Sequence, residues 1–235
     1  MRYIEHIIEP EKLLLSWQPQ PTKGRGRMFV AELIRKENDA DLVYLLDSRE
    51  FKNATSLGFE KYTGFPVEQR RHENVLSIFM KRLPPRSRGD FGKYLDSLRI
   101  RKDAEISDFA LLGYSGAKLP DDDFTVVNTF ENAIPPFELL LHVQGYHYYA
   151  NQLPLSSINQ GQGAVFQPEP ENEFDSRAVK IVINETRVGY VCRGLTESFH
   201  KWFEAGYKID ASIERINGPE DKPEIYLYVS VKMPI

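Results

Sequence analysis

Hydrophobic and polar positions follow a two-residue period in the first part of this chain. Residues 28–34 and 41–46 are rich in apolar and β-branched side chains on either side of the polar stretch 35–40. This pattern predicts two strands joined by a turn. Residues 57–62 alternate in the same way, so a third strand is predicted there.

The period then becomes helical. Apolar side chains recur at helical spacing over residues 74–83, and the double proline Pro84-Pro85 ends the predicted helix. A second helix is predicted to start at Asp90 as its N-cap, and a third near Ser107. Together these patterns indicate a mixed α+β module in the first half of the chain.

A second double proline, Pro135-Pro136, indicates a linker, and short strands dominate beyond it. A helix capped by Thr196 is expected among them, with Phe199 and Trp202 facing the core. Strands are predicted at 137–143, 178–183, 187–192, 211–216 and 225–231. The predicted fold class is therefore α+β. An α+β domain over residues 1–133 precedes a small, partly open β-barrel with an inserted helix over residues 134–235.

Composition and charge limit the kinds of protein this can be. The chain has 235 residues, 41% of them hydrophobic, enough for two domains with real cores. No apolar run is long enough for a membrane span, and the first residues lack the apolar core of a signal peptide. The single cysteine, Cys192, has no disulfide partner in the chain. A cytoplasmic location is expected.

The net charge of −4 lies entirely in the second half of the chain. Residues 136–235 hold 9 lysines and arginines against 13 acidic residues, whereas residues 1–135 hold 21 of each. Non-specific DNA binding normally depends on many phosphate contacts. Any nucleic acid bound by the second half is therefore expected to be held locally.

One stretch of the second half resembles a known family. The acidic turn Glu169-Pro170-Glu171-Asn172-Glu173-Phe174-Asp175 runs directly into an apolar strand. Fourteen residues after Asp175 comes Gly189-Tyr190-Val191-Cys192-Arg193, and Gly145-Tyr146-His147-Tyr148-Tyr149 lies upstream. This set, within about the last hundred residues, resembles the HIRAN domain. The resemblance implies a small barrel that binds the 3′ end of single-stranded DNA.

The resemblance also implies roles for individual residues. His147 and Tyr148 would flank the terminal base, Asn172, Phe174 and Asp175 would line the terminal sugar, and Tyr190 with Arg193 would close the far side. The sequence departs from the family pattern with His147 in place of Arg, Glu171 in place of Asn, and Phe174 in place of Tyr. A second interpretation stays open, in which the turn only satisfies its own backbone through Asx hydrogen bonds and the domain contacts proteins.

Residues 28–127 resemble the first N-terminal subdomain of HipA-like toxin kinases. The matching residues are Leu57, Phe59, Tyr62, Phe79, Leu83, Pro84, Asp108, Phe109, Leu111, Leu112 and Gly116. The sequence has no catalytic-loop or magnesium-binding signature of the kinase core. The resemblance implies an alternative function, an antitoxin-type interaction module of a toxin–antitoxin system that binds a separate HipA-like kinase.

A basic segment, Lys81–Lys102, is the second candidate for nucleic-acid contact. It carries eight lysines and arginines against Asp90 and Asp96, a local charge of +6. Such a patch attracts phosphate, and the residues expected to contact it are Lys81, Arg82, Arg86, Arg88 and Lys93. The smaller basic tract 23–27 would reinforce it. The alternative is a solvated face of two helices.

Searches for catalytic chemistry do not point to an enzyme. Ser115 lies in a partial nucleophile-elbow pattern that lacks the second glycine, and the acidic triplet 121–123 is not followed by an EF-hand loop. No phosphate-binding or dinucleotide loop occurs, and neither a cofactor nor a metal is expected. The predicted function is non-enzymatic DNA binding, with single-stranded DNA or duplex ends as partner. A helicase or nuclease is a further possible partner.

Overall fold

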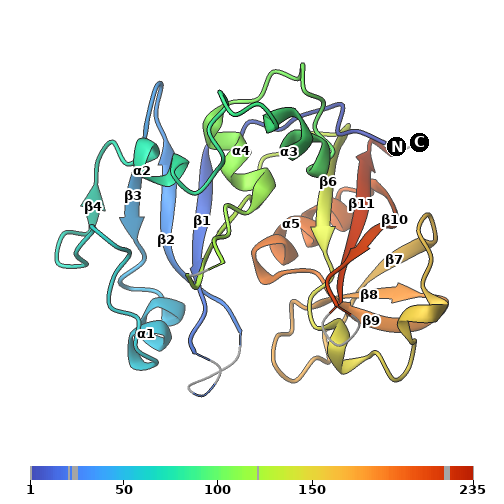
Figure 1. The fold of residues 1–235 in the computed structure, drawn as a ribbon. Coiled ribbons are helices and arrows are strands. Elements are labelled where there is room, and N and C mark those ends of the chain that lie inside the picture. Colours follow the sequence, from blue (N-terminus) through green and yellow to red (C-terminus); the bar gives the residue numbers. More distant parts are fainter. Residues whose placement is uncertain (1, 21, 23–25, 121, 220–222, 235) are drawn as a thin grey trace. The chain divides into compact units, whose positions relative to one another are not determined.

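The computed structural model describes residues 2–20, 22, 26–120, 122–219 and 223–234 (Figure 1). The chain divides into two compact units. One comprises residues 9–129, and the other combines residues 130–235 with the first eight residues of the chain. The sequence pattern gave no indication that these first residues pack with the C-terminal half.

The unit of residues 9–129 is built on a five-stranded antiparallel sheet with the order β4-β3-β2-β1-β5. Its strands are β1 (Lys12–Trp17), β2 (Met28–Arg35), β3 (Ala40–Tyr44), β4 (Arg71–His72) and β5 (Phe124–Val127). The predictions at 28–34 and 41–46 are confirmed by β2 and β3. The prediction of a strand at 57–62 is wrong, because this segment follows helix α1 as a turn whose Phe59 and Tyr62 point into the core.

The helices of this unit are α1 (Arg49–Ser56), α2 (Leu76–Met80), α3 (Phe91–Ser97) and α4 (Asp108–Ser115). Helix α1 contacts β2, and α4 contacts β5. The start of α4 is as expected, since the Ser107 hydroxyl accepts a 3.0 Å hydrogen bond from the amide of Ala110. Gly116 ends α4 in the left-handed conformation, with φ of 73°. Asp90 precedes α3 but makes no side-chain capping bond, which corrects its expected role.

The second unit is built on a six-stranded antiparallel sheet with the order β6-β11-β10-β7-β8-β9. Its strands are β6 (Phe137–His142), β7 (Gly163–Pro168), β8 (Val179–Ile183), β9 (Thr186–Tyr190), β10 (Lys208–Asn217) and β11 (Glu224–Lys232). Two 3₁₀ turns, η1 (Tyr146–Tyr148) and η2 (Leu155–Ser157), follow β6. The sheet is not closed into a barrel. Its edge strands are linked by a bridge in which Gln144 and Tyr190 exchange two backbone hydrogen bonds of 2.9 Å.

Helix α5 (Arg193–Glu204) fills the core of this unit. Phe199 and Trp202 are 0% and 2% exposed, and they contact Phe166 and Phe137 respectively. The helix starts earlier than predicted. Its N-cap is Cys192, and the Thr196 hydroxyl lies inside the first turn, donating to the carbonyl of Arg193.

The first residues of the chain lie on β6 and β11. The phenol of Tyr228 donates a 2.7 Å hydrogen bond to the carbonyl of Tyr3. The carboxylate of Glu138 accepts bonds of 3.0 Å from the amides of Glu5 and His6. These contacts cover a face of the sheet that would otherwise meet solvent. Among the described residues, the structure contains no helix long and apolar enough to cross a membrane.

Candidate functional site

The turn between β7 and β8 is fixed by its own side chains. The side-chain oxygen of Asn172 accepts hydrogen bonds from the amides of Phe174 (3.0 Å) and Asp175 (3.1 Å). The amide of Glu169 donates to the carbonyl of Ala178 at 2.8 Å and closes the base of the turn. The Asx interpretation of this turn is therefore confirmed as a description of its backbone. It leaves open what the outward-facing side chains do.

A polar network holds the turn against β9. The phenol of Tyr190 donates to Glu169 Oε2 at 2.7 Å and accepts from the side-chain amide of Asn172 at 3.1 Å. Arg187 Nη1 donates both to Glu169 Oε1 (2.8 Å) and to the Tyr190 hydroxyl (2.9 Å). A network in which each polar group has a partner is rigid, because losing one bond leaves another group unsatisfied. Glu169 and Asn172 of the turn are thus held to β9 through Arg187 and Tyr190.

The charges in this network are balanced. Burial raises the pKa of Tyr190, and its bonds to Tyr149 and Glu169 raise it further, so the phenol stays protonated and can donate. Burial by itself would raise the pKa of Glu169, but hydrogen bonds from Asn172 and Tyr190 and the charge of Arg187 outweigh it. The net effect is a lowered pKa, and Glu169 is a carboxylate at neutral pH.

Two side chains extend from the turn: Phe174 reaches into solvent, and Asp175 reaches toward neighbouring residues. The ring of Phe174 is 94% exposed, although its backbone is fixed. The carboxylate of Asp175 accepts from the amide of Arg177 at 2.9 Å and lies 3.6 Å from Nε of Arg193, the first residue of α5. The structure therefore brings together an exposed aromatic ring, an oriented carboxylate and a permanent cation.

His147 and Tyr148 lie on η1, which begins at Gly145 with φ of 78°. Their ring centroids are 3.8 Å apart, and Tyr148 is 56% exposed. The next residue, Tyr149, connects this turn to the network, because its ring packs edge-on against Tyr190 at 6.1 Å. Five of the seven residues expected from the resemblance lie in the β7–β8 turn or contact it, whereas His147 and Tyr148 lie on η1 next to Tyr149, which contacts Tyr190. We call the seven the turn site: His147, Tyr148, Asn172, Phe174, Asp175, Tyr190 and Arg193.

Sequence reasoning missed three members of the supporting network: Glu169, Arg187 and Tyr149. Arg187 and Tyr190 are three residues apart, which in a regular strand places them on opposite faces. A bulge in the β8–β9 pairing, between Ile181 and Val182, shifts the register and lets both reach Glu169. The guanidinium of Arg187 also lies over the Tyr149 ring at 4.6 Å. The one signal of this bulge in the sequence is Gly189, since an isolated glycine inside a strand indicates a bulge or a close backbone approach.

The basic segment Lys81–Lys102 is much less available for phosphate binding than its composition suggests. Arg86 bonds to Asp108 at 2.7 Å, and Arg88 forks onto Asp90, with one bond of 2.7 Å. Arg99 is only 8% exposed. Lys81 and Lys93 are exposed, so they remain candidates for phosphate contact. Acidic residues outside the segment, which the sequence count left out, neutralise much of its charge.

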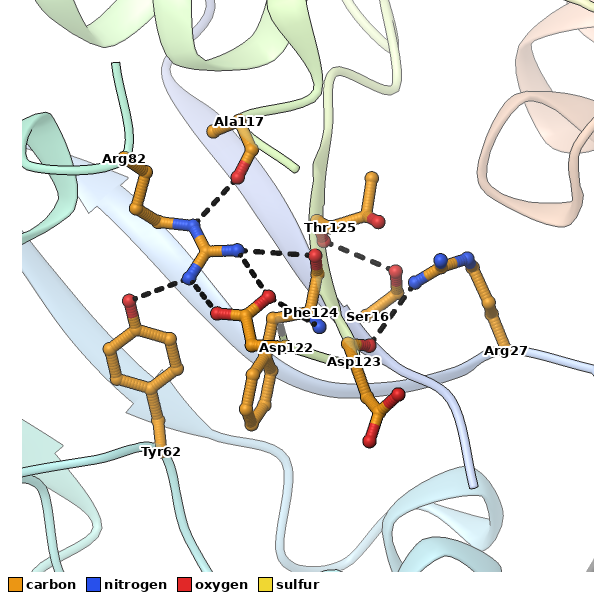
Figure 2. A network of polar contacts seen from close by, with 9 residues as sticks. All are labelled: Ser16, Arg27, Tyr62, Arg82, Ala117, Asp122, Asp123, Phe124 and Thr125. Atoms are coloured by element: carbon orange, nitrogen blue, oxygen red, sulfur yellow. Dashed lines mark hydrogen bonds and ion pairs between the residues drawn. The ribbon is translucent and has the colours of Figure 1, made fainter. Parts of the chain in front are cut away.

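Arg82 is a correction to the expected phosphate-contacting set. Figure 2 shows its guanidinium forking onto Asp122, with one bond of 2.8 Å. It also donates to the carbonyls of Ala117 (2.7 Å) and Phe124 (3.2 Å) and to the Tyr62 hydroxyl (3.2 Å). Its side chain is 3% exposed. All of its nitrogens are bonded inside the unit, so Arg82 does not reach a phosphate in solvent.

The acidic triplet, the basic tract 23–27, Ser115 and Cys192 have structural roles where the structure describes them. Asp122 serves Arg82, and Arg27 donates to the carbonyl of Asp123 at 3.2 Å (Figure 2). Residues 23–25 of the basic tract and Asp121 lie outside the described residues. The Ser115 hydroxyl bonds to the last turn of its own helix at the Leu112 carbonyl. Burial raises the pKa of the Cys192 thiol to about 11, which makes it a poor nucleophile at neutral pH.

Comparison with known proteins gives a likeness in fold over part of the chain. No family model matches the sequence, and no curated protein matches it. The crystal structure of the HIRAN domain of human HLTF is similar at 21% identity and a TM-score of 0.34, over 40% of this chain and 74% of that chain. A structural-genomics protein from Lactobacillus plantarum is similar at 17% identity and a TM-score of 0.33, over 39% and 91%. The function of the turn site must therefore be argued from its own side chains.

Proposed function

We propose that this chain is a binding protein rather than an enzyme, and that its turn site holds DNA ends, above all the 3′ end of a single strand. The supporting observation is the Phe174 ring, which is 94% exposed on a backbone that Asn172 holds in place. Stacking of a base on an aromatic ring contributes about 1–3 kcal/mol and requires no particular sequence. Because the turn is already ordered, little entropy is lost when a base stacks.

Asp175 and Arg193 suit the chemistry of a strand end. A carboxylate accepts a hydrogen bond from a free 3′-hydroxyl and repels a terminal phosphate, so it selects between the two ends. The amide of Arg177 orients the Asp175 carboxylate, and Arg193 lies beside it as a cation for the adjoining phosphate. His147 and Tyr148 on η1 supply further aromatic surface next to β9.

The electrostatics favour local, end-directed binding. Glu171 and Glu173 are exposed on the same turn, and they disfavour a long phosphate backbone lying across it. In the other unit, four of the eight cations of the basic segment pair with acidic side chains, and Lys81, Lys93 and Lys102 are exposed. Affinity should therefore depend on the chemistry of the end more than on the length of duplex DNA.

The test is fluorescence anisotropy with labelled single-stranded oligonucleotides that end in 3′-hydroxyl or 3′-phosphate, across a salt series. We expect preference for the 3′-hydroxyl end in the native chain and loss of this preference in Asp175→Asn. The amide of that variant keeps an acceptor for the Arg177 amide but removes the charge. Asp210→Asn is the matched control, since Asp210 is an exposed carboxylate that bonds Lys232 on the strand pair β10–β11. Equal binding of both ends, or no binding at low salt, would contradict the proposal.

A protein partner is the second candidate function. The paired cations of the N-terminal unit offer phosphate little, which favours a protein partner for that unit. The resemblance of residues 28–127 to HipA-like subdomains makes a separate HipA-like kinase the partner to try first, and a helicase or nuclease the next. The double variant Phe174→Ala and Asp175→Ala separates the two functions. It should abolish end binding but leave neutralisation of a kinase intact.

A further inference from the structure

A shallow hollow of about 360 Å³ lies on the outer face of β7, β8 and β9, next to the turn site. Its volume falls within the range of small-ligand sites. Its lining includes two valines, two cations, an amide and one carboxylate: Val165, Val182, Lys180, Arg187, Gln167 and Glu185. None of these residues belongs to the turn site.

Strand register explains why these side chains share one face. Val165 is paired with Val182 across β7 and β8, and Val182 with Arg187 across β8 and β9. Lys180 is paired with Gln167 on one side and with Tyr190 on the other. Side chains of residues directly opposite each other in antiparallel strands lie on the same face of the sheet. Tyr190, a member of the turn site, therefore lies on the same face of the sheet as the hollow.

The floor of the hollow is apolar and open. Val165 is 57% exposed, an unusual exposure for a β-branched side chain at the middle of a strand. Together with Val182 it forms a surface against which the flat face of a sugar or base can lie. The cations flank this surface, so an apolar contact and a charge contact are available side by side.

The cations connect the hollow to the turn site. Arg187 bonds Glu169 and Tyr190 through Nη1. A guanidinium carries five donors, more than these two contacts use. Lys180 and Arg187 both act on the carboxylate of Glu169 and lower its pKa, which places both positive charges close to the base of the β7–β8 turn. The lining holds these two cations and one acid, Glu185, and because Arg187 is paired with Glu169, Lys180 supplies the positive charge for a ligand.

We propose that this hollow is a second subsite, which holds the third nucleotide from the strand end and the phosphate on its 3′ side when the last two nucleotides lie at the turn site. This inference depends on the proposed function of the turn site. The phosphate lies between Lys180 and Arg187, and the nucleoside covers Val165 and Val182. A single strand that enters over β7 and β8 then reaches Phe174 with its 3′ end.

The experiment measures binding of the full chain to oligothymidylates with a 3′-hydroxyl end, two, four or eight nucleotides long. The shortest probe is measured by competition against the labelled eight-nucleotide probe. The variants are Lys180→Gln, which removes the cation, and Val165→Ser, which removes the apolar floor. Lys208→Gln is the matched control, an exposed lysine on β10 beside Asp210. Thermal unfolding establishes that each variant is folded.

In the native chain we expect affinity to rise between two and eight nucleotides. Lys180→Gln should lower affinity for the eight-nucleotide probe several-fold and leave that for the two-nucleotide probe unchanged. Its slope of log affinity against log salt should fall by about 0.7, the value for one phosphate contact with a single strand. Val165→Ser should reduce affinity for the longer probe without changing the salt slope. Lys208→Gln should change neither.

Two outcomes would overturn the proposal, and they are distinguishable. If the native chain prefers the 3′-hydroxyl end but gains nothing with length, or if Lys180→Gln affects both probes equally, the second subsite is wrong and the turn site stands. If the native chain shows no end preference at any length, the function of the turn site itself is wrong and the subsite falls with it.

Discussion

The side-chain amide of Asn172 donates a 3.1 Å hydrogen bond to the phenol oxygen of Tyr190, eighteen residues further along the chain. The same amide donates to Glu169 at 2.7 Å, while the side-chain oxygen of Asn172 holds the amides of Phe174 and Asp175. Asn172 thus uses both ends of its side chain, one for the sheet and one for the exposed turn. A change on β9 should therefore be felt at Phe174.

Tyr190→Phe tests this coupling. Removing the hydroxyl breaks its hydrogen bonds to Asn172 and to the charged Glu169, although these two stay bonded to each other, and should lower the free energy of unfolding by about 1–3 kcal/mol. It should also weaken end binding, because the turn loses its fastening. Urea unfolding and anisotropy measure the two effects. Tyr226→Phe is the control, since that phenol bonds Glu224 away from the turn. Unchanged end binding in a destabilised Tyr190→Phe variant would show that the network is only structural.

Phe174→Ala should separate binding from stability. A ring that is 94% exposed contributes little to the core, so the free energy of unfolding should change by less than about 0.5 kcal/mol. Loss of base stacking should weaken binding of single-stranded oligonucleotides by about 1–3 kcal/mol, or roughly 5- to 150-fold. Met233→Ala, at 54% exposure, is the matched apolar control. Native affinity in Phe174→Ala would exclude the ring as the stacking platform.

Gly189→Ala should destabilise the C-terminal unit. Gly189 has φ of 153°, and a Cβ placed there would lie 2.4 Å from the carbonyl oxygen of Gln144 and 2.6 Å from Val143. The added methyl group forces apart the Gln144–Tyr190 bridge, at a cost of about 1–3 kcal/mol. Gly163→Ala provides the control, because its nearest atom is 4.0 Å away. Chemical denaturation of both variants checks the difference, and equal stabilities would contradict it.

Arg82→Met should destabilise the N-terminal unit without affecting DNA. Removing one partner of a buried ion pair typically costs about 3–5 kcal/mol, and Asp122 would lose its bidentate partner. Arg88→Met removes an exposed cation paired with Asp90 and should change stability far less than Arg82→Met does, because a surface ion pair contributes little. Both variants should bind oligonucleotides like the native chain. A selective loss of binding in Arg82→Met at a temperature where it is folded would restore Arg82 to the interface.

The lowered pKa of Glu169 predicts an acid-dependent loss of stability. Its partners favour the carboxylate in the folded state, so this stabilisation is complete above the ordinary pKa of 4.5 and is lost as the pH falls through the lower folded-state value. Urea midpoints between pH 7 and pH 3 should therefore decrease less in Glu169→Gln than in the native chain. Glu171→Gln, at an exposed position of the same turn, should retain the native dependence. Identical pH profiles for all three proteins would contradict this assignment.

Much of the secondary structure could be predicted from the sequence. The strands over 28–34, 41–46, 137–143 and 225–231 appear as β2, β3, β6 and β11 with small shifts at their ends. These elements alternate clearly between buried and exposed positions, and Ser107 supplies the local chemistry that starts α4. Short or irregular elements such as β1, β7 and α1 were missed, because their patterns are brief and their partners distant.

The sequence by itself determined the motif of the turn site and the local form of its turn. Asn172 and Asp175 satisfy backbone groups within three residues, and such bonds depend only on near neighbours. The set of side chains around Tyr190 and Arg193 came from the resemblance to the HIRAN domain, and the sequence did not show what holds them.

Tertiary structure decided which charges are available and which are internal. Composition predicts that Arg82 is a surface cation, but in the fold it is bound by Asp122, forty residues further along the chain. Arg187 and Tyr190 are brought together by the bulge in the β8–β9 pairing. The first residues pack on β11 through Tyr228, more than two hundred residues distant. Burial and ion pairing arise from contacts between distant segments, and a one-dimensional pattern specifies the period of an element but not the partner that will cover it.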